Sequence, residues 1–395
     1  MRRAAALAAL LVLAGCARAP ASSTEQNGTA AQAPGLPPAA VEAATSAEPA
    51  PAESLPVRGE GPPLPADGAV LTRIAVGSCS EETKDLPIFA AVAAAKPDLF
   101  LYVGDNVYGD VRANEPGADD PALPKLKQAY ADLALNAQFA AFNMSTPILA
   151  TWNDHDFGRN DAGAEFPFKE RAERMFESFW TTASLGNDHP GVYGARTFGP
   201  AGQRVQVIML DTRFFRSGLK KGEPDANGRR PYVPQTEPGA TLLGDAQWRW
   251  LEAELKRPAD IRLLVSSIQV LSDNHPFEAW WTMPAEQKRL YDIVRASRAK
   301  GVVLVSGDRH VGALYRKVGL APYPLHELTA SSLNRDFVKS DAEMGSAQLG
   351  KVYTPANFGL IEIDWKARSL ALSVRGLDGA AVRRLAIPFR DLGLG

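Results

Sequence analysis

The sequence has little of what would indicate a disulfide framework, a nucleic-acid-binding surface or a membrane-embedded domain. It contains only two cysteines, Cys16 and Cys79, so a set of disulfides is excluded as the source of its stability. Its formal net charge of -2 provides no overall basic face of the kind that nucleic-acid binding needs. The apolar run at residues 4–14 is too short to span a bilayer as a helix. With 45% hydrophobic and 22% charged residues, the chain is instead typical of a globular protein with a large core.

The N-terminus has the features of an export signal. Two arginines precede the apolar run, whose length is that of a signal-peptide core. The run ends in Leu-Ala-Gly-Cys at residues 13–16, which resembles the bacterial lipobox, where the peptide is cleaved before Cys and that Cys is acylated. We therefore expect a lipoprotein signal peptide at residues 1–15 and a membrane anchor through lipid on Cys16, with the protein on the periplasmic or cell-surface side. A soluble secreted protein cleaved elsewhere is the alternative.

Composition divides the rest of the chain into two parts. Residues 16–67 are rich in Ala, Pro, Glu, Ser and Thr and almost free of large apolar residues, so they cannot bury enough surface to offset the entropy lost on ordering. We predict a disordered linker here, with a mean span of roughly 40 Å. Residues 68–395 are predicted to form one folded domain, which we expect to be monomeric.

Within the domain, apolar runs typical of β-strands alternate with amphipathic stretches typical of helices. Strands are predicted at residues 71–76, 98–103, 147–151, 204–210, 261–265, 302–305, 358–363 and 369–374, and helices at 88–95, 244–255 and 284–299. The last two strands are predicted to form a hairpin. This order indicates an α/β fold with layered, mixed sheets.

Polar clusters follow four of the predicted strands. They lie at residues 77–80, 104–110, 153–161 and 306–310. In open α/β sheets, ligands bind at the carboxyl ends of the strands, so we expect these clusters to meet. Taken singly, Asp105 is explained equally well as a turn residue, and His310 as a structural histidine. The adjacent Asp154, His155 and Asp156 are harder to explain without a cation, because neighbouring ionisable groups repel or desolvate one another.

Oxygen, imidazole and thiolate donors that converge on one sheet edge are suited to a polynuclear metal site. Two metals that share a carboxylate can hold a phosphoryl group and stabilise both the attacking and the leaving oxygens of an in-line displacement. The clusters therefore predict metal-dependent phosphoryl chemistry.

At these residues the chain resembles the calcineurin-like metallophosphoesterases and, within them, the alkaline phosphatase D (PhoD-like) family. The resemblance extends from about residue 72 to residue 387. It rests on Gly-Ser-Cys-Ser at 77–80, Gly-Asp-Asn-Val-Tyr-Gly-Asp at 104–110, Asn-Asp-His-Asp at 153–156, and Ser-Gly-Asp-Arg-His at 306–310, with further similar segments at 243–248 and 327–332.

The resemblance implies a four-layer αββα sandwich, export, and hydrolysis of phosphate monoesters or diesters. It also implies the role of each matched residue. Asp105 would bridge two metals, and Tyr108, Cys79 and His310 would bind the more oxidising one, Fe(III). Asp154 and Asp308 would complete the cluster, with His155 acting beside it.

The chain departs from the wider superfamily in having fewer histidines at the site. Ser78-Cys79-Ser80 stands where an Asp-x-His pair is usual, and Gly307-Asp308-Arg309-His310 where Gly-His-x-His is usual. A site rich in oxygen donors favours Ca(II) beside Fe(III), as the family resemblance also implies, while other divalent metals stay open.

The expected mechanism is attack on phosphorus by a metal-bound hydroxide, while His155 stabilises the transition state or protonates the leaving oxygen. Asp156 could orient that imidazole or form a salt bridge elsewhere. Arg159 and Asn160 are candidates to bind phosphate oxygens. Alternatively, Arg159 pairs with an aspartate at position 161 or 110.

Two other kinds of function stay open on the sequence alone. One is a non-catalytic surface lipoprotein, a binding module that keeps the fold and a structural cation. The other is a hydrolase with Ser78 or Cys79 as nucleophile, although the Gly-x-Ser-x-Gly elbow is absent. The preference for monoesters or diesters depends on loop shape, which the sequence does not define.

Overall fold

The computed structural model of the protein describes residues 54–181, 185, 188–273, 275–336 and 345–395. The predicted signal peptide, Cys16 and most of the predicted linker lie outside these residues. None of the described helices is long and apolar enough to cross a membrane.

The first of two six-stranded sheets carries the three strands that begin the domain. In spatial order its strands are β12 (Ala381–Pro388), β11 (Ser369–Arg375), β10 (Phe358–Asp364), β1 (Arg73–Gly77), β2 (Leu99–Val103) and β3 (Ile148–Thr151). β1, β2 and β3 are parallel, so the loops that follow them leave the same edge of the sheet. The predicted hairpin is present as β10 and β11, which extend the sheet beyond β1.

The second sheet has a parallel centre and antiparallel edges. In spatial order its strands are β4 (Gly194–Phe198), β5 (Val205–Met209), β6 (Ile261–Val265), β7 (Val302–Ser306), β9 (Leu325–Ala330) and β8 (Gly312–Lys317). β5, β6, β7 and β9 run parallel, and β4 and β8 close the edges.

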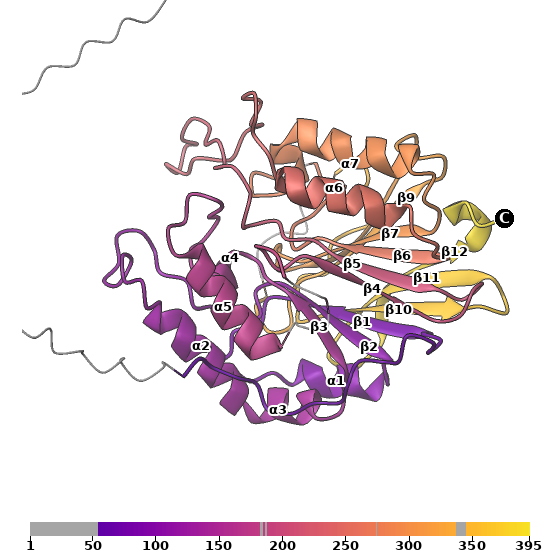
Figure 1. The fold of residues 1–395 in the computed structure, drawn as a ribbon, viewed down its shortest axis with the longest axis horizontal. Helices are drawn as coiled ribbons and strands as arrows, with labels where there is room; N and C mark the ends of the chain where they lie inside the picture. Colours follow the sequence, from indigo (N-terminus) through magenta and orange to yellow (C-terminus); the bar gives the residue numbers. More distant parts are fainter. Residues whose placement is uncertain (1–53, 182–184, 186–187, 274, 337–344) are drawn as a thin grey trace, which may run out of the picture. The chain divides into compact units, whose positions relative to one another are not determined.

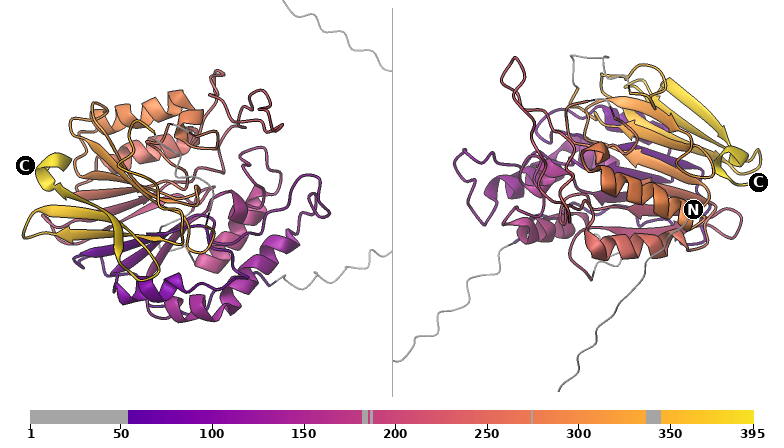
Figure 2. Two further views of the ribbon diagram at one scale, coloured as in Figure 1. Left: turned by 180° about the vertical axis from the view of Figure 1, so that it is seen from behind. Right: turned by 90° about the horizontal axis from the view of Figure 1, so that it is seen from above.

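The two sheets lie face to face, with helices on both outer sides (Figures 1 and 2). The sequence of β2 explains this layering, because all of its residues are buried. Leu99, Leu101 and Val103 belong to the core between the sheets. Phe100 and Tyr102 point to the other side and pack toward helices. The helices outside the first sheet are α1 (Ile88–Ala94), α2 (Pro124–Leu135), α3 (Ala137–Asn143) and α5 (Lys169–Trp180), and those outside the second are α6 (Gly244–Leu255) and α7 (Pro284–Ala296). The predicted four-layer αββα sandwich is confirmed.

Residues 54–67, which the sequence places in the linker, contact the domain. Arg58 Nη1 donates to Asn143 Oδ1 at 3.0 Å, and the Gly199 amide donates to the Asp67 carbonyl at 2.6 Å. Leu55 and Leu64 pack against two of the hydrophobic clusters. The folded part of the chain therefore begins before residue 68.

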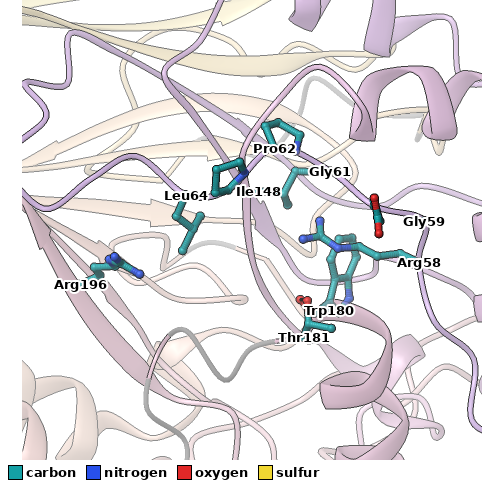
Figure 3. A pocket seen from close by; sticks show the side chains of 11 residues that line it. Arg58, Gly59, Gly61, Pro62, Leu64, Ile148, Trp180, Thr181 and Arg196 are labelled. Carbon is teal, nitrogen blue, oxygen red and sulfur yellow. Dashed lines mark hydrogen bonds between the residues drawn. The ribbon is translucent and has the colours of Figure 1, made fainter.

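A cavity of about 570 Å³ lies beside this segment, with Arg58, Trp180 and Arg196 among its lining residues (Figure 3). Ile148, the first residue of β3, also lines it. The polar cluster at 153–161 follows the opposite end of that strand, and the described residues that line the cavity include none of the predicted metal ligands.

Candidate metal centre

The loops that follow β1, β2, β3 and β7 meet at one place. The amides of Cys79 and Ser80 donate to the carbonyls of Gly104 and Asp105, at 3.4 and 3.0 Å, which joins the first two loops. Gly307 allows the loop after β7 to approach the first sheet closely. A Cβ at this position would lie only 2.6 Å from Ser78 Oγ and 2.8 Å from the Val103 carbonyl oxygen, so a larger residue would not fit. The expected convergence of the four clusters therefore occurs.

Four of the predicted ligands adopt a backbone conformation that side chains disfavour. The φ angles are 60° at Cys79, 49° at Asp105, 73° at Asp308 and 53° at His310. Each such residue costs on the order of 1–2 kcal/mol. Strained residues of this kind are concentrated at functional sites.

The first group of donors contains sulfur, nitrogen and oxygen. Ligand atoms of Cys79, Asp105 and His310 all lie within 4.8 Å of one another. Cys79 Sγ is 3.2 Å from Asp105 Oδ2, and the Tyr108 hydroxyl is 3.0 Å from His310 Nε2. The four residues predicted to surround Fe(III) are therefore brought together.

The second group is richer in oxygen and shares a member with the first. Ligand atoms of Asp105, Asp154 and His155 also lie within 4.8 Å of one another. Asp308 joins them through Asn153, whose Nδ2 donates to Asp154 Oδ1 and to Asp308 Oδ1, each at 2.9 Å. Asp105 thus stands between the two groups, which is the position that a bridging ligand requires.

The carboxylate of Asp105 fits a metal ligand for a second reason. Its Oδ1 atom is buried, and it accepts no hydrogen bond from any described residue. A buried carboxylate oxygen without a partner is costly unless a cation contacts it. The residues present therefore fit a centre with more than one cation.

The pKa values around Asp105 reflect the crowding of negative charge. Burial, followed by the charges of Cys79 and Asp154, raises the pKa of Asp105 well above its usual value. Burial and the charge of Asp154 raise the pKa of Asp308 to about 6. Burial likewise raises the pKa of the Cys79 thiol. Bound cations would relieve this repulsion and favour the ionised side chains.

Asp154 and His155 shift in the directions expected of a charged pair. Burial raises the pKa of Asp154, but the charges of His155 and Arg213 outweigh it and lower the pKa overall. Burial lowers the pKa of His155, but Asp154 and the hydrogen bond to Asp110 raise it to about 10. These shifts favour the charged form of His155, which partly balances the carboxylates.

Asn153, which the sequence analysis did not single out, organises the carboxylates. Its Oδ1 accepts from Arg213 Nε at 3.0 Å and from Ser267 Oγ at 2.9 Å, which turns its Nδ2 toward the carboxylates. Arg213 is itself buried and pairs with Glu278 at 2.7 Å, and Glu278 also pairs with the buried Arg216 at 3.1 Å. Asn153 lies in the family-like block at 153–156, but no motif marked the arginines or Glu278.

Of the two roles that the sequence leaves open for Asp156, its contacts do not support the orientation of His155. Its carboxylate accepts from the Asn153 amide at 2.6 Å and from the Asn106 amide and Nδ2 at 3.1 and 2.6 Å, so it holds two loops together. His155 is oriented by a different residue, because its Nδ1 is 2.6 Å from Asp110 Oδ1. The two residues follow one another in the short helix α4 (Asp154–Phe157), and successive helical side chains do not face each other.

Arg159, the first residue of the predicted phosphate-binding pair, is half-buried. Arg159 Nη2 donates to the Ala118 carbonyl at 2.8 Å, and its guanidinium lies 5.0 Å from the centroid of the Phe166 ring. Asn160 is exposed. Their contact with phosphate stays a prediction.

Comparison with known proteins gives one family match. The model of the family described as PhoD-like phosphatase matches residues 74–366. Among solved structures, one titled "Structure of PhoD" is 18% identical with a TM-score of 0.63, covering 82% of this chain and 70% of that chain. GAP50, the anchor in the inner membrane complex of Plasmodium, is 13% identical with a TM-score of 0.49, covering 81% and 89%. At these identities the structural likeness concerns the fold alone. No curated protein matches the chain.

The raised carboxyl pKa values predict how metal binding depends on pH. Asp308 ionises in the folded state only above about pH 6, and protons compete with cations for its carboxylate. Bound metal favours the ionised form, so the part of the stabilisation that depends on Asp308 should diminish as pH falls through 6. We expect the difference in melting temperature between metal-loaded and metal-stripped domain to shrink over this interval. A difference that stays constant from pH 8 to pH 5 would contradict the site.

Proposed function

The chain belongs to the PhoD-like phosphatase family, and we propose that it is an exported, lipid-anchored hydrolase of phosphate monoesters or diesters with an iron and calcium centre. Family membership supports phosphoester hydrolysis. The observation that supports a centre with more than one cation is the pair of donor groups that share Asp105.

The chemistry of the donor atoms suggests which cation each of the two groups would bind. A thiolate, a phenolate and an imidazole, from Cys79, Tyr108 and His310, suit Fe(III), because anionic, polarisable donors stabilise ferric iron. The carboxylates of Asp154 and Asp308 suit Ca(II), with Asp105 shared by both groups. Cations in these places would supply positive charge to the phosphoryl oxygens and lower the pKa of a nearby water.

The chain's own contribution to the reaction centres on His155. Asp110 binds its Nδ1, so Nε2 is the ring nitrogen that can give a proton to the leaving oxygen. The imidazole lies against Tyr108, with ring centroids 4.2 Å apart. This contact and the bond to Asp110 fix the ring, and Asn153 and Arg213 hold the carboxylates in place beside it.

A hydrolase that uses Ser78 or Cys79 as nucleophile is disfavoured. Both side chains are fully buried, and Ser78 Oγ donates to the Ala330 carbonyl at 3.2 Å. Burial raises the pKa of the Cys79 thiol, which opposes formation of a reactive thiolate in the absence of a metal.

Hydrolysis of p-nitrophenyl phosphate and bis-p-nitrophenyl phosphate tests the function directly. We expect the purified domain to cleave at least one of them, to lose activity in EDTA, and to regain it when iron and calcium are restored. Activity that resists EDTA would favour the nucleophilic hydrolase. A metal-containing domain that cleaves neither substrate, with His155→Ala indistinguishable from wild type, would favour the non-catalytic binding module.

Asp110 and Asp156 form a matched pair for testing the orientation of His155. We expect Asp110→Asn to lower kcat by roughly 10- to 100-fold with little change in stability, as for other residues that orient an active-site side chain. Asp156→Asn should instead lower the free energy of unfolding by about 1–3 kcal/mol, because it disturbs buried hydrogen bonds. Steady-state kinetics and urea unfolding distinguish the two effects. Wild-type kcat in Asp110→Asn would show that Asp110 does not orient the acid.

The proposed anchor rests on the N-terminal sequence alone. Cys16 follows an apolar run that begins after two arginines, in the arrangement of a lipoprotein signal. We expect radiolabelled palmitate on the wild-type protein in a bacterial host, and its loss in Cys16→Ser together with release from the membrane fraction. Unchanged labelling of Cys16→Ser would remove the anchor from the proposal without affecting hydrolysis.

A further inference from the structure

A short segment after β9 lies along the loop that carries Cys79. The Leu333 amide donates to the Ser78 carbonyl at 3.0 Å. The Asn334 side chain accepts from the Glu81 amide at 2.7 Å and donates to the Glu81 carbonyl at 2.9 Å. These bonds fix the backbone of residues 333–335 beside the candidate metal centre.

Arg335, the last residue of this segment, is directed at Tyr108. Its guanidinium carbon lies 4.3 Å from the centroid of the Tyr108 ring, and its Nη1 donates to Glu81 Oε2 at 2.5 Å. The same tyrosine contacts His155 through its ring and His310 through its hydroxyl. Tyr108 therefore contacts the guanidinium, the candidate proton donor His155 and the candidate ligand His310.

The side chain of Arg335 is also accessible, with 35% of its surface exposed. A guanidinium has five N–H donors, so its bonds to Glu81 and Tyr108 leave donors for a bidentate contact with an anion. Stacking on an aromatic ring and an ion pair together hold the group in one orientation, which lowers the entropy lost when it binds a ligand.

The other arginines near the centre are less suited to binding substrate. Arg213 is fully buried and paired with Glu278, so it cannot meet a ligand from solvent. Arg159 donates to the Ala118 carbonyl and lies over Phe166. Arg309, between Asp308 and His310, is buried, and its guanidinium lies 4.1 Å from the centroid of the Phe277 ring. Among the arginines described around the centre, Arg335 combines exposure, a fixed orientation and contact with Tyr108.

We propose that Arg335 binds the phosphoryl oxygens of the substrate and of the product phosphate, and that Glu81 is the residue that positions it. This inference rests on the proposed function, since it assigns the anion that the centre receives. It adds a guanidinium beside the metal-binding residues, and the positive charge of this group would neutralise part of the substrate's negative charge.

Inorganic phosphate is the probe that tests this proposal. Isothermal titration of the metal-loaded, full-length protein measures its dissociation constant without turnover. We expect Arg335→Gln to weaken phosphate binding by roughly 10- to 100-fold, the loss typical of one charge-assisted contact. KM for p-nitrophenyl phosphate should rise by a similar factor. Arg335→Lys should fall between, because it keeps the charge but loses the planar fork.

Two further variants separate binding from a structural role. Arg295→Gln removes an exposed arginine on α7 that pairs with Asp292 at 3.2 Å, so it should change neither constant. Glu81→Gln leaves the guanidinium in place but less firmly held, so it should weaken phosphate binding by only a few-fold. Metal content is measured for each variant, since metal loss in Arg335→Gln would indicate a structural role and overturn the proposal.

The outcomes distinguish this proposal from the function on which it rests. If wild type cleaves phosphate esters but Arg335→Gln and Arg335→Lys keep its phosphate affinity and KM, the role of Arg335 is refuted and the function stands. If wild type neither cleaves esters nor binds phosphate, both are refuted. If it binds phosphate through Arg335 without cleaving esters, the centre is an anion-binding site and only hydrolysis fails.

Discussion

The buried negative charge of Asp105 is the constraint on which the rest of the centre depends. Its carboxylate is surrounded by Cys79 and Asp154, and one of its oxygens accepts no hydrogen bond from the described residues. Such a group is stable in ionised form only beside positive charge. The charge of His155 supplies part of it, and bound cations would supply the rest. The positive φ angles of Cys79 and Asp308 are backbone strain of the kind found at functional sites.

The fold provides this centre by bringing four loops from two sheets to one edge. Parallel strands place three loops side by side, and the absence of a side chain at Gly307 lets the loop after β7 approach the first sheet. Asn153 links Arg213 to the carboxylates. Its Oδ1 accepts from Arg213, and its Nδ2 donates to Asp154. The packing of the two sheets therefore determines how far apart the donor groups lie.

The sequence predicted the parts that repeat a local pattern. All eight predicted strands and the three predicted helices are present, because their apolar periodicity reflects burial in a layered sandwich. Helices α2, α3 and α5 and the edge strands β4, β8 and β12 were missed, although the apolar residues of α2 and α5 recur at helical spacing. Family-like blocks identified the residues that converge. Adjacency in sequence misled the assignment of Asp156, since the partner of His155 is Asp110. The ion pairs of Glu278 join segments with no local signature and needed the three-dimensional structure.

The metal content of Asp105→Asn, measured by elemental analysis beside Cys79→Ser, tests the shared carboxylate most directly. The exposed Asp364 provides a control, Asp364→Asn, that should retain the wild-type content. If Asp105 belongs to both donor groups, its substitution should reduce every metal that the wild-type protein binds, whereas Cys79→Ser should deplete only the metal of the sulfur-containing group. An Asp105→Asn protein that folds and keeps the full wild-type metal content would contradict this account.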